Sequence, residues 1–352
     1  MHCASWVRTD IRAAFIPMGY GAQDLQMAYG LTSAAASNGA TQTVAIVDAF
    51  DNPNAEADLA VYRTQFGLPA CTTNNGCFMK VNQNGIAGSY PPTDPLGLWE
   101  SEEILDLDMA SAICPNCEII LVEADDNSNL NLYAAENTAA VTCAASVVSN
   151  SWDGGEYFGE NSDEVNFNHG IPITVAGGDS GYDQVGVDGY PSSSAYVTAV
   201  GGTTLPCVGC VESVWPLSGS ICSVYISQPS WQTALGSSYT SVCSTRITND
   251  VAAVGDPNTG VAVYDSYGSG GWTVFGGTSV ATPIIAGVYA LAGSVIGNGS
   301  LPYGAPAGSL HDITSGSNDT GSPSCGGNFL CNAEPGYDGP SGNGTPNGIG
   351  GF

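Results

Sequence analysis

Residues 276–292 read GGTSVATPIIAGVYALA, and this stretch decides where the core of the fold must lie. A helix that is apolar on all sides is stable only in a protein interior, so we predict a buried helix over residues 278–292. The Gly-Thr-Ser turn at its start places the Ser279 hydroxyl at the positive end of the helix, where a developing alkoxide is stabilised. The alternative is that Thr278 or Ser279 only caps the helix.

Strand-like apolar runs recur along the chain, with helix-compatible stretches between most of them. The predicted strands cover residues 43–50, 118–123, 146–152, 171–176 and 196–202. The predicted helices before residue 278 cover 55–66, 99–113 and 129–140. Buried strands that alternate with helices indicate an α/β fold, with a mostly parallel central sheet flanked by helices.

The remaining segments are rich in Gly, Ser, Asn and Pro. Residues 206–271 are predicted to form long disulfide-stapled loops plus one strand over 261–264, and the composition of residues 315–352 is that of a linker. No internal repeat is present. We therefore expect an N-terminal extension and first helix over 1–40 and a single catalytic domain over 41–352.

Charge is scarce and one-sided in this chain. The 33 Asp and Glu residues outnumber the 5 Lys and Arg, which gives a formal net charge of −28 and a charged fraction of 11%. Nucleic acids and anionic membranes are therefore not expected as partners. In strong acid only those 5 cations and the 3 His residues carry side-chain charge. Unfolding by repulsion between cations is therefore largely avoided at low pH.

The 12 cysteines suggest an oxidising, extracellular setting. Close spacing predicts four local disulfides, namely Cys71–Cys77, Cys207–Cys210, Cys222–Cys243 and Cys325–Cys331. Zinc is a competing interpretation of the two C-x-x-C pairs, at 114–117 and 207–210, but no His lies near them in sequence. A redox role for the 114–117 pair is also weak, because this pair follows a helix pattern instead of opening one.

Two carboxyl residues on one predicted helix are candidates for acid–base chemistry. Residues 99–110 read WESEEILDLDMA, in which Glu102 and Asp106 are four residues apart and so share a face. Paired carboxyls on an apolar face exchange protons, and their titrations are coupled. A solvated helix side is the alternative interpretation. Periodicity does not exclude Glu103.

A third acid, Asp179, follows a predicted strand in the sequence AGGDSG at 176–181. The carboxyl ends of parallel strands are where α/β sheets bind ligands. If Asp179 is protonated, it can donate a hydrogen bond to an oxyanion; otherwise it only closes a turn.

None of the three histidines, His2, His169 and His311, lies in a Gly- and His-rich motif suited to a serine nucleophile. We expect them to be surface residues or to make local turn hydrogen bonds. An imidazole is also protonated below about pH 6 and cannot then accept the serine proton, whereas a carboxylate can.

These motifs together resemble the sedolisin (serine-carboxyl peptidase) family, whose members have a subtilisin-like fold and work in acid. The resemblance rests on the Glu-x-x-x-Asp helix, the Gly-Asp-Ser-Gly turn, the Gly-Thr-Ser-x-x-x-Pro helix start and a C-terminal metal signature, spread over residues 41–346. It implies that Ser279 is the nucleophile, Glu102 the general base and acid, Asp106 its proton-sharing partner and Asp179 the oxyanion donor. The segment Ser-Asn-Ser-Trp at 149–152 resembles the substrate-binding edge of the family.

The resemblance also implies one calcium ion near the C-terminus. The sequences HDIT at 311–314 and EPGYD at 334–338 are similar to the calcium site of the family. The implied ligands are the carboxylates of Asp312 and Asp338 and the carbonyls of Ile313, Glu334 and Gly336. An all-oxygen site of this kind suits Ca²⁺.

The sequence therefore leads us to expect a secreted, monomeric, acid-acting peptidase. Its partners would be protein or peptide substrates, with an upstream pro-segment as a possible inhibitor. Two rivals remain: a Ser-His-Asp enzyme that uses Asp48, for which the histidine motif is missing, and a catalytically silent calcium-bound binding protein on the same scaffold.

Overall fold

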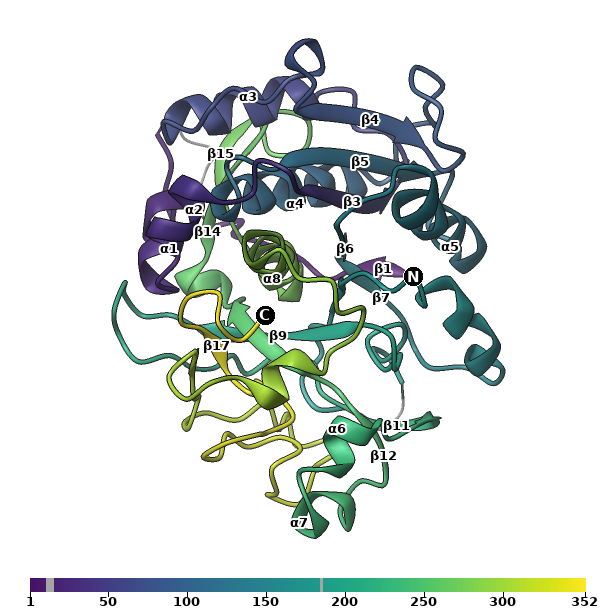
Figure 1. Ribbon diagram of the computed structural model, residues 1–352, viewed down its shortest axis with the longest axis vertical. Coiled ribbons are helices and arrows are strands. Elements are labelled where there is room, and N and C mark those ends of the chain that lie inside the picture. Colours follow the sequence, from purple (N-terminus) through teal and green to yellow (C-terminus); the bar gives the residue numbers. More distant parts are fainter. Residues whose placement is uncertain (11–15, 184–185) are drawn as a thin grey trace.

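The computed structural model describes residues 1–10, 16–183 and 186–352, and its centre is a mostly parallel sheet (Figure 1). Within the described residues this sheet has eight strands, seven of them in the order β10-β9-β8-β6-β3-β5-β4, with β13 also paired to β9. Only the β10–β9 pair is antiparallel. The strands are β3 (Thr43–Ala49), β4 (Phe78–Asn82), β5 (Glu118–Ala124), β6 (Val147–Asn150), β8 (Ile173–Ala176), β9 (Thr198–Thr204), β10 (Ser213–Val214) and β13 (Val251–Val254).

Successive strand residues face opposite sides of the sheet, and both sides are buried. In β3, Val44 and Ile46 belong to the core that contains α4 and α8, whereas Ala45 and Val47 belong to the core that contains α5. Helices therefore cover both faces, which is why the strands are apolar without polar alternation. The predicted α/β class with a mostly parallel sheet is confirmed.

The central helix α8 (Thr278–Ala292) is buried almost throughout, as its sequence predicts. It packs against α4 (Trp99–Ile113), and the two helices lie side by side near the middle of the molecule (Figure 1). A Cβ atom at Gly287 would lie only 2.7 Å from Cβ of Ile113, so glycine allows this close approach. The other helices are α1 (Ala22–Ala28), α2 (Thr32–Ser37), α3 (Ala55–Gln65), α5 (Asn129–Asn137), α6 (Ser230–Thr233) and α7 (Ser237–Thr240).

Several short strands complete the fold outside the central sheet. They are β1 (His2–Cys3), β2 (Trp6–Val7), β7 (Trp152–Asp153), β11 (Cys222–Ser227), β12 (Thr245–Ile247), β14 (Val261–Asp265), β15 (Gly271–Gly276), β16 (Leu310–His311) and β17 (Thr345–Pro346). The expectation that residues 206–271 are loops plus one strand was wrong, because β13 of the central sheet lies there with several other elements. Its four residues are too few to show a period in the sequence.

All four disulfides predicted from spacing are present. A fifth joins Cys114 to Cys117, so both C-x-x-C pairs are disulfides instead of zinc ligands. Cys3 and Cys143 are the free cysteines among the described residues. The same residues contain no helix that is both long enough and apolar enough to cross a bilayer.

Candidate active site

Ser279 lies at the start of α8, where its hydroxyl faces the end of strand β6. Its Oγ donates a hydrogen bond to the carbonyl of Ser151 at 3.1 Å, and the Ser151 hydroxyl donates to the carbonyl of Ser279 at 3.3 Å. Both residues are fully buried. The helix start therefore holds the serine at the carboxyl edge of the parallel sheet, which is where such sheets place their reactive groups.

Glu102 on α4 is the carboxyl group that faces this serine. Burial raises its pKa to about 7, and the hydroxyls of Ser279 and Ser5 limit the rise. Neither carboxyl oxygen of Glu102 has a partner at hydrogen-bonding distance among the described residues, so its contact with Ser279 is looser than a formed hydrogen bond. Such bonds are often long in sites without a bound substrate, and they tighten when the substrate binds.

Asp106 lies one turn further along α4, and Asp48 at the end of β3 approaches both α4 acids. Burial, followed by the charges of Asp48 and Glu102, raises the pKa of Asp106 well above its usual range. Burial, followed by the charges of Glu102 and Glu123, raises the pKa of Asp48 in the same way. The three buried carboxyls interact with one another, so their titrations are coupled and the observed pKa values describe the three together.

The sequence suggested Asp48 for a Ser-His-Asp triad or as a strand-end acid that caps a turn, whereas the structure places it with two other acids. Within the described residues, none of the three histidines makes a hydrogen bond to Ser279 or Asp48. His169 makes the expected local contact, with Nε2 at 2.7 Å from the carbonyl of Asn166. Nε2 of His2 instead lies 3.3 Å from Oδ1 of the buried Asp188, a contact that the sequence did not suggest.

Glu103, which periodicity left open, points to a different group. Its Oε2 accepts a hydrogen bond from the backbone N–H of Asn52 at 3.2 Å, and the charge of Glu123 raises its pKa further after burial. Glu123 in turn pairs with Lys80 at 2.9 Å. The charge of Asp48 acts on both neighbouring glutamates, but Glu103 bonds to Asn52 and only Glu102 faces the serine.

Asp179 lies at the start of α8, on the side of the Ser279 backbone. Its Oδ1 accepts hydrogen bonds from the backbone N–H and the hydroxyl of Thr278 at 2.8 and 2.9 Å. Its Oδ2 is buried and has no partner among the described residues, and burial raises the pKa of this carboxyl well above its usual range. A protonated Oδ2 would be a hydrogen-bond donor aimed into the site.

Asp188 positions the Asp179 turn, and no sequence signal identified it. Its Oδ2 accepts from the backbone N–H groups of Asp179 and Ser180 at 3.0 and 2.9 Å. The nine-residue separation between Asp188 and Asp179 fits no local motif, so only tertiary folding brings them together.

Of the predicted calcium ligands, the carboxylates of Asp312 and Asp338 both contact the turn at residues 334–338. Asp312 accepts from the backbone N–H of Gly336 through both oxygens, at 3.1 and 3.0 Å. Asp338 accepts from the backbone N–H of Glu334 at 3.1 Å. Asp338 is buried, and after that burial the charge of Asp312 is among the causes that raise its pKa to about 7. Two carboxylates at one turn supply oxygen donors of the type that Ca²⁺ prefers.

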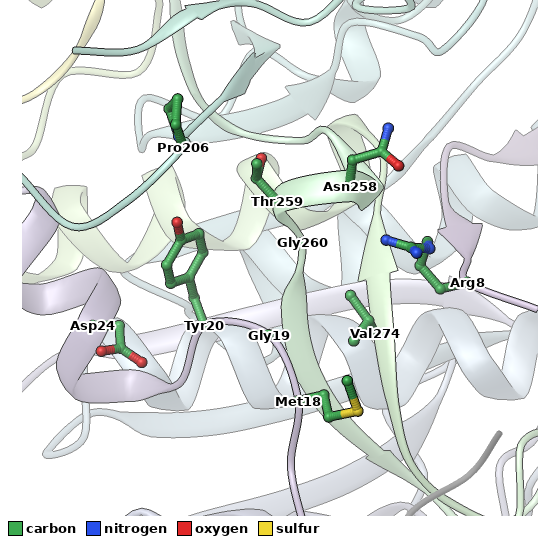
Figure 2. Close-up of a pocket in the computed structure, with 10 residues that line it drawn as sticks. All are labelled: Arg8, Met18, Gly19, Tyr20, Asp24, Pro206, Asn258, Thr259, Gly260 and Val274. Carbon is green, nitrogen blue, oxygen red and sulfur yellow. The ribbon is translucent and has the colours of Figure 1, made fainter. Parts of the chain in front are cut away.

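A separate pocket lies away from these groups. Figure 2 shows Arg8, Tyr20 and Thr259 among its lining residues. Among the described residues that line it, none is one of the four predicted catalytic residues.

Comparison with known proteins identifies the family and the fold of this chain. A model of the subtilase family matches residues 85–305, which is more than half of the chain. Sedolisin from Pseudomonas sp. (strain 101) is 31% identical over 211 residues, covering 50% of this chain and 33% of sedolisin. Xanthomonalisin from Xanthomonas sp. (strain T-22) is 31% identical over 160 residues, covering 36% of this chain and 18% of that protein. The chain thus spans about a third or less of the length of these curated relatives.

Solved structures give a longer match. Pseudomonas sedolisin, a serine-carboxyl proteinase solved with two molecules of pseudo-iodotyrostatin, superposes with a TM-score of 0.76 at 25% identity. The match covers 94% of this chain and 96% of that one. A psychrophilic protease, S41, superposes with a TM-score of 0.57 at 18% identity, covering 95% and 99%, and supports the fold alone. The predicted resemblance to sedolisin is confirmed.

Proposed function

The chain belongs to the subtilase family, and on this premise we propose that it is an acid-acting serine-carboxyl peptidase that hydrolyses peptide bonds through an acyl-enzyme on Ser279. The observation that carries the proposal is the buried carboxyl of Glu102 facing Ser279, with no histidine bonded to that serine among the described residues. Its substrates are proteins or peptides. The disulfides fit a secreted protein, which we expect to act as a monomer.

In the first step, Ser279 Oγ attacks the carbonyl carbon of the substrate while its proton passes to Glu102. Asp106 and Asp48 share the resulting change of charge within the buried carboxyl group. The oxyanion accepts hydrogen bonds from the Ser279 backbone N–H and from protonated Asp179. Glu102 then returns the proton to the leaving amine, and water hydrolyses the acyl-enzyme by the reverse sequence of proton transfers.

This mechanism limits the working pH. One carboxyl of the Glu102 group must be free to accept a proton while Asp179 keeps its own, which predicts a bell-shaped profile. Burial raises the pKa of Asp179 as well as that of Glu102. A protonated Asp179 and an ionised carboxyl in the Glu102 group can therefore be present at the same pH. Activity should fall at the alkaline end of the profile, because ionised Asp179 no longer donates a hydrogen bond to the oxyanion.

We also propose that one Ca²⁺ is held by Asp312 and Asp338 through carboxylates and by Ile313, Glu334 and Gly336 through carbonyls. The ion would supply a positive charge between two acids that otherwise repel each other. It would tie residues 315–352 to the rest of the fold, and it would take no part in the chemical steps.

Matched variants of the two neighbouring glutamates test the proposal. Glu102→Gln should lower the rate of cleavage of an unfolded protein about 10²- to 10⁴-fold, as expected for loss of a general acid–base group. Glu103→Gln removes a buried carboxyl one residue away that does not face the serine, so it should keep most of the activity. Equal losses in the two variants would contradict the role of Glu102.

Ser279→Ala provides the second arm, measured from pH 2 to 8. It should abolish both digestion and covalent trapping of the protein by a peptide aldehyde. Failure of the parent chain to digest protein or to react with the aldehyde would favour the silent binding protein. Digestion that is equal or greater at pH 8, and lost in Ser279→Ala, would overturn the acid mechanism.

A further inference from the structure

His2 and two buried aspartates meet where β1 pairs with β7 (Figure 1). In the register of this pair, His2 lies opposite Asp153, the last residue of β7. Nε2 of His2 lies 3.9 Å from Oδ1 of Asp153 and 3.3 Å from Oδ1 of Asp188. The three side chains together offer one nitrogen and two oxygen atoms that all lie within 4.8 Å of one another.

Each aspartate is held in place through only one of its two oxygens. Oδ2 of Asp153 accepts a hydrogen bond from the backbone N–H of Gly189 at 3.1 Å. Oδ2 of Asp188 accepts from the backbone N–H groups of Asp179 and Ser180 at 3.0 and 2.9 Å. Hydrogen bonds of this kind orient the carboxylates that bind metal ions in proteins.

The other oxygen of each aspartate has no hydrogen-bond partner among the described residues. Asp153 is 0% exposed and Asp188 is 1% exposed, so water does not take the place of a partner at the surface. Buried carboxylates are normally paired, hydrogen-bonded or bound to a metal ion. Two buried oxygens directed at one imidazole nitrogen therefore indicate a missing ligand between them.

The charges around these oxygens favour a divalent cation. Among the described residues, no Lys or Arg forms an ion pair with Asp153 or Asp188. A protonated His2 would bring one positive charge to two carboxylates, and its Nε2 proton can point to only one of them. A divalent ion instead balances both charges and contacts both oxygens.

The mixed nitrogen and oxygen donors select the kind of ion. Zn²⁺ binds imidazole nitrogen and carboxylate oxygen at about 2.0–2.2 Å, which at tetrahedral angles places ligand atoms about 3.4 Å apart. The separation of 3.3 Å between His2 and Asp188 fits this value, and the 3.9 Å to Asp153 needs only a small closure. Ca²⁺ and Mg²⁺ prefer oxygen donors alone and suit this set less well.

The site is open on the side of His2. The His2 side chain is 52% exposed, whereas both aspartates are buried. An ion can therefore enter from the solvent past the imidazole and keep water at its remaining position, so the site has an entry path as well as anchored ligands.

We propose that His2, Asp153 and Asp188 form a binding site for one Zn²⁺ ion, separate from the proposed calcium site. The ligands are Nε2 of His2 and Oδ1 of each aspartate. The bound ion joins β1 to β7 and to the turn at Asp179, because Asp188 holds that turn through its other oxygen. This inference goes beyond the proposed peptidase function and does not depend on it.

The test is calorimetric titration of ZnCl₂ into the Ser279→Ala chain at pH 7, with excess Ca²⁺ present so that the proposed calcium site is filled. We expect one Zn²⁺ per chain, and His2→Ala should weaken its binding about tenfold or more. His169→Ala is the matched control, because Nε2 of His169 contacts the carbonyl of Asn166 and lies in a different loop; its affinity should stay within about twofold. Equal affinity in the two variants, or no saturable binding of Zn²⁺, would overturn the proposal.

Asp153→Asn tests the buried side of the site. Asn keeps an oxygen for the Gly189 N–H but lacks the charge, so Zn²⁺ should bind about tenfold or more weakly. Zn²⁺ should also raise the Tm of the parent but not that of His2→Ala. Because His2→Ala changes a half-exposed side chain, it keeps the test decisive if Asp153→Asn does not fold. An equal rise in Tm in His2→Ala and the parent would place the ion elsewhere and contradict the assignment.

Chemical modification locates the ion directly. Diethyl pyrocarbonate acylates free imidazole nitrogen, and mass analysis of peptides reports each histidine separately. Zn²⁺ should protect His2 from the reagent and leave the modification of His169 and His311 unchanged. Modification of His2 that proceeds equally with and without saturating Zn²⁺ would show that this imidazole is not a ligand.

Discussion

Replacing Glu136 by Gln should make the fold markedly less sensitive to rising pH. Glu136 on α5 has no exposed surface, and neither of its carboxyl oxygens has a hydrogen-bond partner among the described residues. Burial raises its pKa from the ordinary 4.5 to about 8, and the Asn150 side chain opposes only part of the rise. The folded protein therefore keeps a proton that the unfolded chain releases.

The sign and size follow from proton linkage. A carboxyl with a raised pKa contributes fully to stability below its unfolded value, and this contribution is lost as the pH rises toward the folded value. Each pH unit between the two values is worth about 1.4 kcal/mol. The interval from 4.5 to pH 7 is 2.5 units. Glu136 should therefore lower the free energy of unfolding by about 3 kcal/mol between pH 4.5 and pH 7. Gln stays neutral and removes this loss.

The assay is urea unfolding, monitored by tryptophan fluorescence at pH 4, 5.5 and 7. Both proteins carry Ser279→Ala, so that self-digestion does not interfere. The difference in free energy of unfolding between Glu136→Gln and its parent should grow by about 3 kcal/mol from pH 4 to 7. Glu118→Gln makes the same charge change at an exposed position and serves as the control. A difference that stays constant within about 0.5 kcal/mol would refute the reasoning.

Three further predictions concern the catalytic acid, the metal and a disulfide. Asp179→Asn should move the alkaline limb of the pH profile of kcat/KM to higher pH. Burial raises the pKa of the Asp179 carboxyl, which still ionises at high pH, whereas an amide stays neutral. An unmoved limb would contradict the role of Asp179. Chelation of calcium with EGTA should lower Tm and expose residues 315–352 to cleavage by added proteinase K. Added Ca²⁺ should reverse both effects, and Mg²⁺ should not. Replacing Cys222 and Cys243 by Ser opens a loop with a sequence separation of 21 and should lower the free energy of unfolding by about 3 kcal/mol in urea; a loss below about 0.5 kcal/mol would contradict a stabilising role.

Local pattern was sufficient for the elements that are long and uniformly apolar. The helix over 278–292 and the strand over 43–49 appear almost as predicted, because full burial on all sides leaves an unbroken apolar run in the sequence. Strand β13 was missed, because its sequence Val-Ala-Ala-Val has the same composition as many loops and helices. It becomes a strand only by pairing with β9.

The candidate site shows the same division. The i, i+4 spacing was enough to place Glu102 and Asp106 on one face, since helix geometry alone fixes it. The choice between Glu102 and Glu103 required the structure, because each faces a different buried group. Asp188 could not be found from sequence, because its link to the Asp179 turn crosses a loop with no recurring motif.

By itself, the sequence determined the buried helix that carries Ser279, the acids available beside it and the shortage of cations. These properties depend on composition and local spacing, which a chain keeps whether or not it is folded. Only the tertiary structure decided which carboxyl faces the serine and where the first nine residues lie. The Ala4 carbonyl reaches the Ser279 N–H across 275 positions of chain, a contact that no local pattern encodes and that exists only once the strands on both sides have paired.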